Sequence, residues 1–176
     1  GPAGDGSAYE TVTYEGYGPA GVALYVEALT DNRNRTAAEV RHIFSKNDGS
    51  LAESGAVAWL FERRGIVLVD GSADEDELTL AAAEGGADDI STDGAGYSVV
   101  SAPENLAAVR DAIQAVGIEV QSAELTLVPT TTVELEDEAD AKKVLRLMDA
   151  LEENDDVQDV YANFDIPERV LEAVAT

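Results

Sequence analysis

The segment from Tyr14 to Lys46, YEGYGPAGVALYVEALTDNRNRTAAEVRHIFSK, decides how the rest of the chain folds. Val22 to Leu29 places apolar side chains on both faces and is rich in β-forming residues, which predicts a central strand. Thr36 is followed three residues later by Glu39, and this capping box predicts that a helix begins at Thr36. The segment therefore predicts a strand, a polar and basic turn, and a helix.

The apolar pattern places further elements around this segment. The buried stripe of the predicted helix is Ala37, Val40 and Phe44, at helical spacing. Val57 to Glu62 reads as a strand, which Arg63-Arg64-Gly65 separates from a second strand at Ile66 to Val69. Thr131 to Leu135 is expected as a strand, and Asp137 to Glu153 as a helix.

The order of the expected elements predicts an α+β fold with two domains. Residues 66–128 alternate as β-α-β-β-α-β, the pattern of a ferredoxin-like domain. Residues 9–55 and 131–176 each lack enough strands to close a sheet, so we expect them to pack together as one discontinuous α+β domain. The ferredoxin-like domain, 56–130, would then be inserted between them, and the Gly-rich residues 1–8 would form a flexible lead-in.

Composition narrows the class of protein. The 176 residues contain no cysteine, which excludes disulfides and thiolate chemistry, and no apolar run approaches the roughly 20 residues of a membrane span. The net charge of −25 is unevenly spread, since residues 65–176 hold twenty-seven acids against five bases. Residues 31–64 hold six bases against five acids. A salt-adapted surface would account for the acidity but leaves this basic segment unexplained.

The basic segment is the candidate site. Arginine binds phosphate bidentately, and two arginines beside a helix start would present their side chains next to unpaired backbone N–H groups. Alternatively, these arginines pair with Asp31 and Glu39, and the asparagines beside them make turns. The candidate nucleic-acid contacts are Asn32, Arg33, Asn34, Arg35, Arg41, His42, Lys46, Arg63, Arg64 and Tyr17.

Catalysis is not expected. The single histidine, His42, has no carboxylate placed by the sequence to orient it, and the glycines of Gly16–Gly21 are followed by a strand, unlike a dinucleotide-binding loop. Three acidic clusters coincide with helix ends, where acids cap and complement the dipole: Asp74–Glu77, Glu134–Asp140 and Glu152–Asp159. We expect no catalytic residue, cofactor, metal or small-molecule substrate. A metal- or ligand-dependent binding protein or enzyme that uses these clusters is the alternative of another class.

Four blocks carry a family resemblance: YEGYGPAGVAL, EALTDNRNRTAAEVRHIFSKN, GAVAWLFERRG (Gly55–Gly65) and DDVQDVYANFDIP (Asp155–Pro167). They resemble the YebC/PmpR family of gene-expression regulators, which includes mitochondrial translational activators of cytochrome oxidase. The family usually begins with a Lys-rich helical domain that has no counterpart here, so the chain resembles the second and third domains only. The resemblance implies the inserted arrangement of domains.

The resemblance also implies a non-enzymatic regulator whose partner is nucleic acid, either ribosomal RNA on the ribosome or promoter DNA. The predicted helix is short and half-buried, which suits backbone contact better than reading of base edges, so we lean toward a translation factor. A DNA-binding transcriptional regulator is the close alternative. Binding is expected to be weak without the Lys-rich domain. We expect a cytoplasmic protein, mitochondrial if eukaryotic, with no membrane partner.

Overall fold

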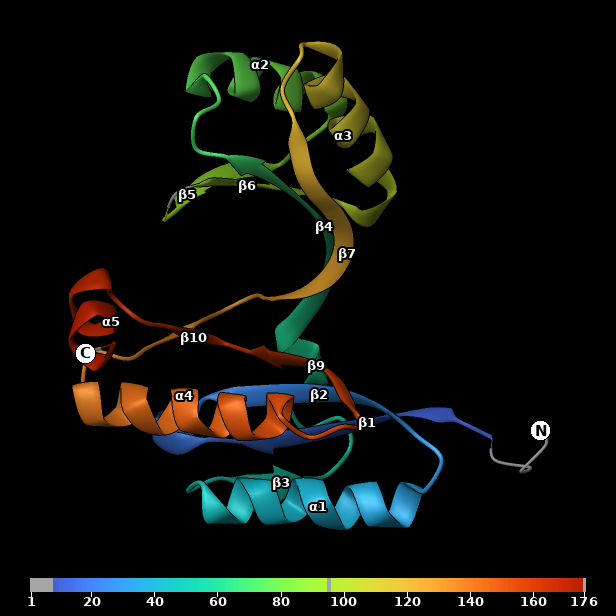
Figure 1. Cartoon of the computed structure of the whole chain (residues 1–176), viewed down its shortest axis with the longest axis vertical. Coiled ribbons are helices and arrows are strands. Elements are labelled where there is room, and N and C mark those ends of the chain that lie inside the picture. Colours follow the sequence, from blue (N-terminus) through green and yellow to red (C-terminus); the bar gives the residue numbers. More distant parts are fainter. Residues whose placement is uncertain (1–7, 95, 176) are drawn as a thin grey trace. The chain divides into compact units, whose positions relative to one another are not determined.

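The computed structural model describes residues 8–94 and 96–175, so the predicted lead-in of residues 1–8 lies almost wholly outside the described part. The fold is a mixed α+β fold in which most strand pairs are antiparallel, which confirms the predicted fold class (Figure 1). The chain divides into two compact units. The first runs up to Phe61 and resumes at Pro129, and the second is Glu62–Val128.

A four-stranded sheet forms the centre of the first unit. Its strand order is β3-β1-β2-β9, and each neighbouring pair is antiparallel. The strands are β1 (Glu10–Tyr17), β2 (Ala23–Thr30), β3 (Ser50–Ala52) and β9 (Val157–Ala162), and a short 3-10 turn, η1 (Pro19–Gly21), joins the first two. The predicted strand Val22 to Leu29 is therefore confirmed as β2, with a neighbour on each side.

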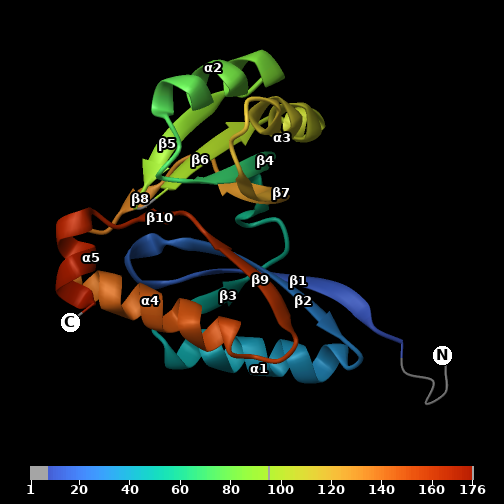
Figure 2. The same cartoon turned by 45° about the horizontal axis from the view of Figure 1, so that its top comes forward.

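Two helices cover one face of this sheet, and Figure 2 shows them next to each other. They are α1 (Arg33–Lys46) and α4 (Glu138–Glu152). The residues of the shared core that have no exposed surface include Val40 and Phe44 of α1, Leu147 and Leu151 of α4, and Leu24 and Val26 of β2. Burying a large apolar side chain stabilises a fold by about 1.5–3 kcal/mol, so this core is a main source of stability in the unit.

The start of α1 differs from the prediction. The helix begins at Arg33, and the side chain of Asn32 caps it by accepting a 3.1 Å hydrogen bond from the backbone N–H of Arg35. The predicted capping box is therefore wrong: Thr36 is a fully buried residue inside the helix. Of the predicted stripe, Val40 and Phe44 are fully buried, whereas Ala37 is only partly buried.

The segment after β3 is shaped by a buried carboxylate. Glu15, only 5% exposed, accepts hydrogen bonds of 2.7–2.8 Å from the backbone N–H groups of Gly55, Val57 and Ala58. Burial raises the pKa of Glu15, but these three hydrogen bonds outweigh it and hold the pKa below its ordinary value. Two of the bonded amides lie in the predicted strand Val57 to Glu62. Its first part instead forms a 3-10 turn, η2 (Ala58–Leu60), and its last two residues begin the strand β4 (Phe61–Asp70).

The second unit has the predicted ferredoxin-like order of elements. Its sheet order is β5-β6-β4-β7, and helices lie between β4 and β5 and between β6 and β7. Its elements are β4 (Phe61–Asp70), α2 (Glu75–Gly85), β5 (Asp89–Asp93), β6 (Gly96–Ser101), the turn η3 (Pro103–Asn105), α3 (Leu106–Ala115) and β7 (Val120–Pro129). The predicted break at Arg63-Arg64-Gly65 is wrong, because β4 runs through it.

The end of the chain completes the first unit. Two short parallel strands, β8 (Val133–Glu134) and β10 (Phe164–Asp165), pair before the last helix, α5 (Glu168–Val174). The predicted strand Thr131–Leu135 thus reduces to two residues. Asn163, just before β10, bonds to both backbone groups of Ala23 at 2.8 and 3.1 Å, which ties this segment to β2. No helix in the described residues is long and apolar enough to cross a membrane.

Candidate nucleic-acid interface

Most of the predicted contact residues gather on α1. Seven of the ten lie on this helix or at its cap, and all seven are exposed: Asn32, Arg33, Asn34, Arg35, Arg41, His42 and Lys46. The helix carries four bases against one acid. Among the α-helices that the structure describes, it alone has more bases than acids. The sequence therefore concentrates positive charge on one element of a very acidic protein.

The two arginines nearest the helix start are engaged with carboxylates. Arg33 donates to Glu10 at 2.8 Å, and Arg35 donates to Asp156 at 3.0 Å and more weakly to Asp31 at 3.4 Å. Hydrogen bonding to these carboxylates raises the pKa of both guanidinium groups. The alternative of local pairing therefore holds for Arg35 and Asp31, but the main partners lie far away in the sequence.

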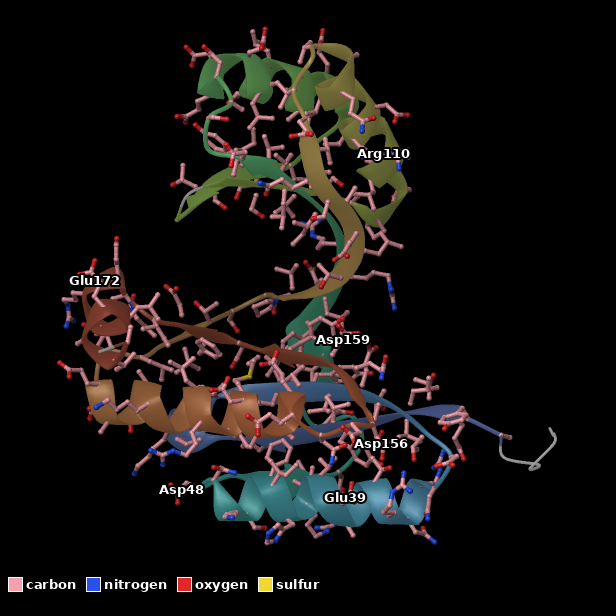
Figure 3. All side chains as sticks on the ribbon, in the orientation of Figure 1. Glu39, Asp48, Arg110, Asp156, Asp159 and Glu172 are labelled. Atoms are coloured by element: carbon pink, nitrogen blue, oxygen red, sulfur yellow. The ribbon has the colours of Figure 1, made fainter. Side chains whose placement is uncertain are left out.

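Arg35 belongs to a structural network at the start of α1. Its partner Asp156 also accepts a 2.7 Å hydrogen bond from the hydroxyl of Thr36, and this hydroxyl lies 2.7 Å from that of Thr30. The bond from Thr36 lowers the pKa of Asp156 and, together with Arg35, outweighs the opposing effect of burial. Figure 3 shows Asp156 above the N-terminal half of α1. This network fixes the helix start, so Arg35 has a structural role.

Further along α1, the basic side chains are left unpaired. Arg41 and Lys46 are exposed, and no carboxylate among the described residues lies within 4 Å of either one. Asn34 and His42 are exposed on the same outward side of the helix, opposite the buried Val40. This outward face of α1 is therefore available to an external anion.

The remaining predicted contacts lie elsewhere. Gly16 faces the helices, because a Cβ there would lie 2.7 Å from the ring of Phe44, and the next residue, Tyr17, therefore points to the opposite side of the sheet. Arg63 and Arg64 belong to the second unit, where Arg64 pairs with Asp88 at 3.0 Å. Tyr17 therefore does not belong to the basic face of α1, and Arg63 and Arg64 lie in the other unit.

Sequence reasoning missed a second group of bases, which lies on α4. Lys142, Lys143 and Arg146 are exposed, and no described carboxylate lies within 4 Å of them. The sequence KKVLR, residues 142–146, contained the signal. Lys142 and Arg146 are four positions apart and therefore share one side of a helix. The acids elsewhere in this helix concealed it.

Comparisons with known proteins agree with the fold. Residues 9–164 match the family model described as the TACO1/YebC second and third domain. The chain is 51% identical to a probable transcriptional regulatory protein of Halothermothrix orenii over 97% of its own length and 68% of the relative's. It is 55% identical to a protein of the same description from Rubrobacter xylanophilus, over 95% of this chain and 67% of the relative.

A solved structure is also similar. The crystal structure of a conserved hypothetical protein from Aquifex aeolicus matches with a TM-score of 0.83 and 45% sequence identity, over 94% of this chain and 68% of that one. The family match covers the basic helix α1, the segment held by Glu15 and the Asp156 network. The chain therefore belongs to the TACO1/YebC family, through its second and third domains.

Proposed function

We propose that this protein regulates gene expression without catalysing a reaction, by contacting nucleic acid through the outward face of α1. One observation carries the proposal: in a chain of net charge −25, Arg41 and Lys46 stand without a carboxylate partner among the described residues. Phosphate neutralisation by such cations supplies most of the affinity for nucleic acid. The relatives' names, which refer to transcriptional regulation, support the same general role.

Structured RNA, including that of the ribosome, suits this face better than promoter DNA. Reading base edges requires an element that enters the major groove. One side of α1 is buried against the sheet through Val40 and Phe44, and a strand, β2, precedes it where a helix-turn-helix would have a helix. A DNA-binding transcriptional regulator remains the second candidate, because the relatives' names favour it.

The first experiment compares two double variants of the whole chain. Arg41→Gln with Lys46→Gln removes two cations from α1, and Arg110→Gln with Arg169→Gln removes two that pair with Asp111 and Glu136. Both variants have the same net charge. Cosedimentation with ribosomes and binding to a promoter-length DNA fragment would be measured side by side at low salt. We expect the α1 variant to lose ribosome association and the control to keep it.

The unmodified chain should bind with a dissociation constant of about a micromolar or weaker at physiological salt, as non-specific nucleic-acid binders do. Equal ribosome binding by the two variants would contradict the role of α1. Loss of sequence-specific promoter binding with unchanged ribosome association would favour the transcriptional candidate. A rise in melting temperature with a divalent cation or a nucleotide would favour a ligand-dependent protein instead.

A further inference from the structure

The unpaired cations of this protein gather on two neighbouring helices. All eleven Lys and Arg residues lie in the described part, and six of them have no described carboxylate within 4 Å, although the chain contains 36 acids. Five of the six, Arg41, Lys46, Lys142, Lys143 and Arg146, lie on α1 and α4. Because acids outnumber bases by more than three to one, cations left uncompensated on adjacent elements indicate an external anion.

One cation of each helix, Lys46 and Lys143, borders the groove between α1 and α4. The first half of α1 contacts the chain just after α4, through Arg35 to Asp156 and Glu39 to Asn154 at 3.0 Å, so the helices run antiparallel. Lys46 lies seven residues after Glu39, on the same stripe of α1 that faces α4.

On the other helix, Lys143 lies one turn before Leu147, whose Cδ2 would lie 3.4 Å from a Cβ placed on Gly49, just past the end of α1. Packed helices lie about 8–10 Å apart, so Lys46 and Lys143 flank the same end of the groove. The other three cations lie beside this end on the solvent side of the two helices: Lys142 and Arg146 line a hollow with Val174 of α5, and Arg41 lies on the flank of α1 away from α4.

The opposite end of the groove has the opposite charge. A hollow of about 490 Å³ is lined there by Arg35, Glu39, Glu153, Asn154, Asp155 and Asp156. Four carboxylates against one arginine repel phosphate, so a polyanion is confined to the basic end.

Three carboxylates also lie near the basic end: Asp48, Asp140 and Asp149. Figure 3 shows Asp48 beyond the end of α1. None of the three forms an ion pair within 4 Å among the described residues.

We propose that Arg41, Lys46, Lys142, Lys143 and Arg146 form a two-helix surface that contacts the phosphate backbones of double-helical RNA. The proposal rests on the proposed function and names the class of nucleic acid. Single strands are held largely by stacking on aromatic rings. Phe44 is the sole Phe, Tyr or Trp of α1 and α4 and is fully buried, so His42 is the one ring exposed there.

The shape of the surface separates RNA from DNA. Two packed helices, with axes about 8–10 Å apart, are together wider than the major groove of DNA, which admits a single helix, so both sets of cations cannot enter it. The minor groove of an RNA helix is wide and shallow, and proteins recognise it by shape and by backbone contacts. Cations spread over two neighbouring helices suit contact across such a broad groove.

The test adds a third double variant, Lys143→Gln with Arg146→Gln, to the α1 variant and the Arg110→Gln, Arg169→Gln control. The probes are a blunt RNA duplex of about 16 base pairs, the length that double-stranded RNA-binding domains span, together with the DNA duplex of the same sequence and one RNA strand alone. Affinity is measured at several salt concentrations. We expect the whole chain to prefer the RNA duplex, and the α4 variant to bind it about tenfold more weakly than the control.

The salt dependence distinguishes direct contact from altered folding. Each lost phosphate contact should reduce the slope of log K against log salt by about 1 in magnitude. The slope of the α4 variant should therefore be smaller by about 1–2, and the slope of the control should be unchanged. If the α4 variant matches the control while the α1 variant loses binding, the two-helix surface is wrong and the proposed function stands. Equal or tighter binding to the DNA duplex or the single strand would overturn the assignment to double-helical RNA. If all three variants bind equally, both proposals fail.

Discussion

The hydroxyl of Thr36 donates a 2.7 Å hydrogen bond to the carboxylate of Asp156, which lies 120 residues further along the chain. The same carboxylate accepts from Arg35, and the hydroxyl of Thr30 lies 2.7 Å from that of Thr36. The bond joins the first turn of α1 to the residue just before β9. It therefore links the two sequence segments of the first unit at the point where the basic helix begins.

Thr36→Val should destabilise the protein by about 1–3 kcal/mol, because it keeps the shape of a fully buried side chain but removes the donor to Asp156. Urea denaturation of the whole chain measures the change in the free energy of unfolding. The matched control is Thr79→Val, because the exposed hydroxyl of Thr79 bonds only to the Glu75 carbonyl of its own helix. Equal losses in the two variants would refute a special role for Thr36.

The contribution of Asp156 should depend on pH. The hydrogen bond from Thr36, helped by Arg35, lowers the pKa of Asp156 in the folded state. A lowered pKa gives stability that is present above the unfolded value of about 3.9 and is lost as the pH falls through the folded value. Asp156→Asn should therefore lower the melting temperature at pH 7, and its difference from the unmodified chain should shrink at acid pH. The control is Asp155→Asn, at an exposed neighbouring position. A melting-temperature difference between Asp156→Asn and the unmodified chain that stays constant down to acid pH would contradict this pH dependence.

Glu15→Gln should cost about 2–3 kcal/mol of unfolding free energy, because an amide replaces a carboxylate that accepts three backbone hydrogen bonds in a buried position. The amide NH₂ group would face N–H donors that then have no acceptor. Glu53→Gln, at an exposed site in the same segment, should change stability by less than about 0.5 kcal/mol. Chemical denaturation of both variants measures the change. A Glu15→Gln protein as stable as the control would show that the three hydrogen bonds to Glu15 do not stabilise the fold.

Fragments should differ in their ability to fold. We predict that residues 56–130 fold alone, and that residues 1–55 do not, because Val40 and Phe44 of α1 pack against Leu147 and Leu151 of α4. Circular dichroism and thermal unfolding of the two fragments provide the measurement. A cooperative unfolding transition in the fragment 1–55 would show that the first segment needs no partner.

Local patterns in the sequence were sufficient for most of the fold. The stripe of Val40 and Phe44 identified the buried side of α1. The acidic cluster Asp74–Glu77 identified a helix end, and Asp74 caps α2 there by accepting from the N–H of Glu77. The order of strands and helices identified the ferredoxin-like unit. These features depend on residues only a few positions apart, and that is why a single sequence reveals them.

The errors arose where a distant residue decides the local structure. Thr36 and Asn32 are both good caps, and the bond from Thr36 to Asp156 leaves Asn32 as the cap. The apolar run Val57 to Glu62 resembles a strand, but Glu15 binds the amides that a strand would need for its ladder. The bases of α4 were missed because their significance depends on α1 lying beside them.

The pairing of β2 with β9 also sets an order of events during synthesis. Residues 24–28 pair with residues 157–162, so β2 leaves the ribosome long before its partner exists. At about 5–20 residues per second, this strand waits roughly 7–27 s, while the whole of Glu62–Val128 is synthesised in the meantime. Synthesis of the first unit therefore starts before that of the second unit and ends after it, and until then β2 presents an unpaired edge to any cellular protein that shields nascent chains.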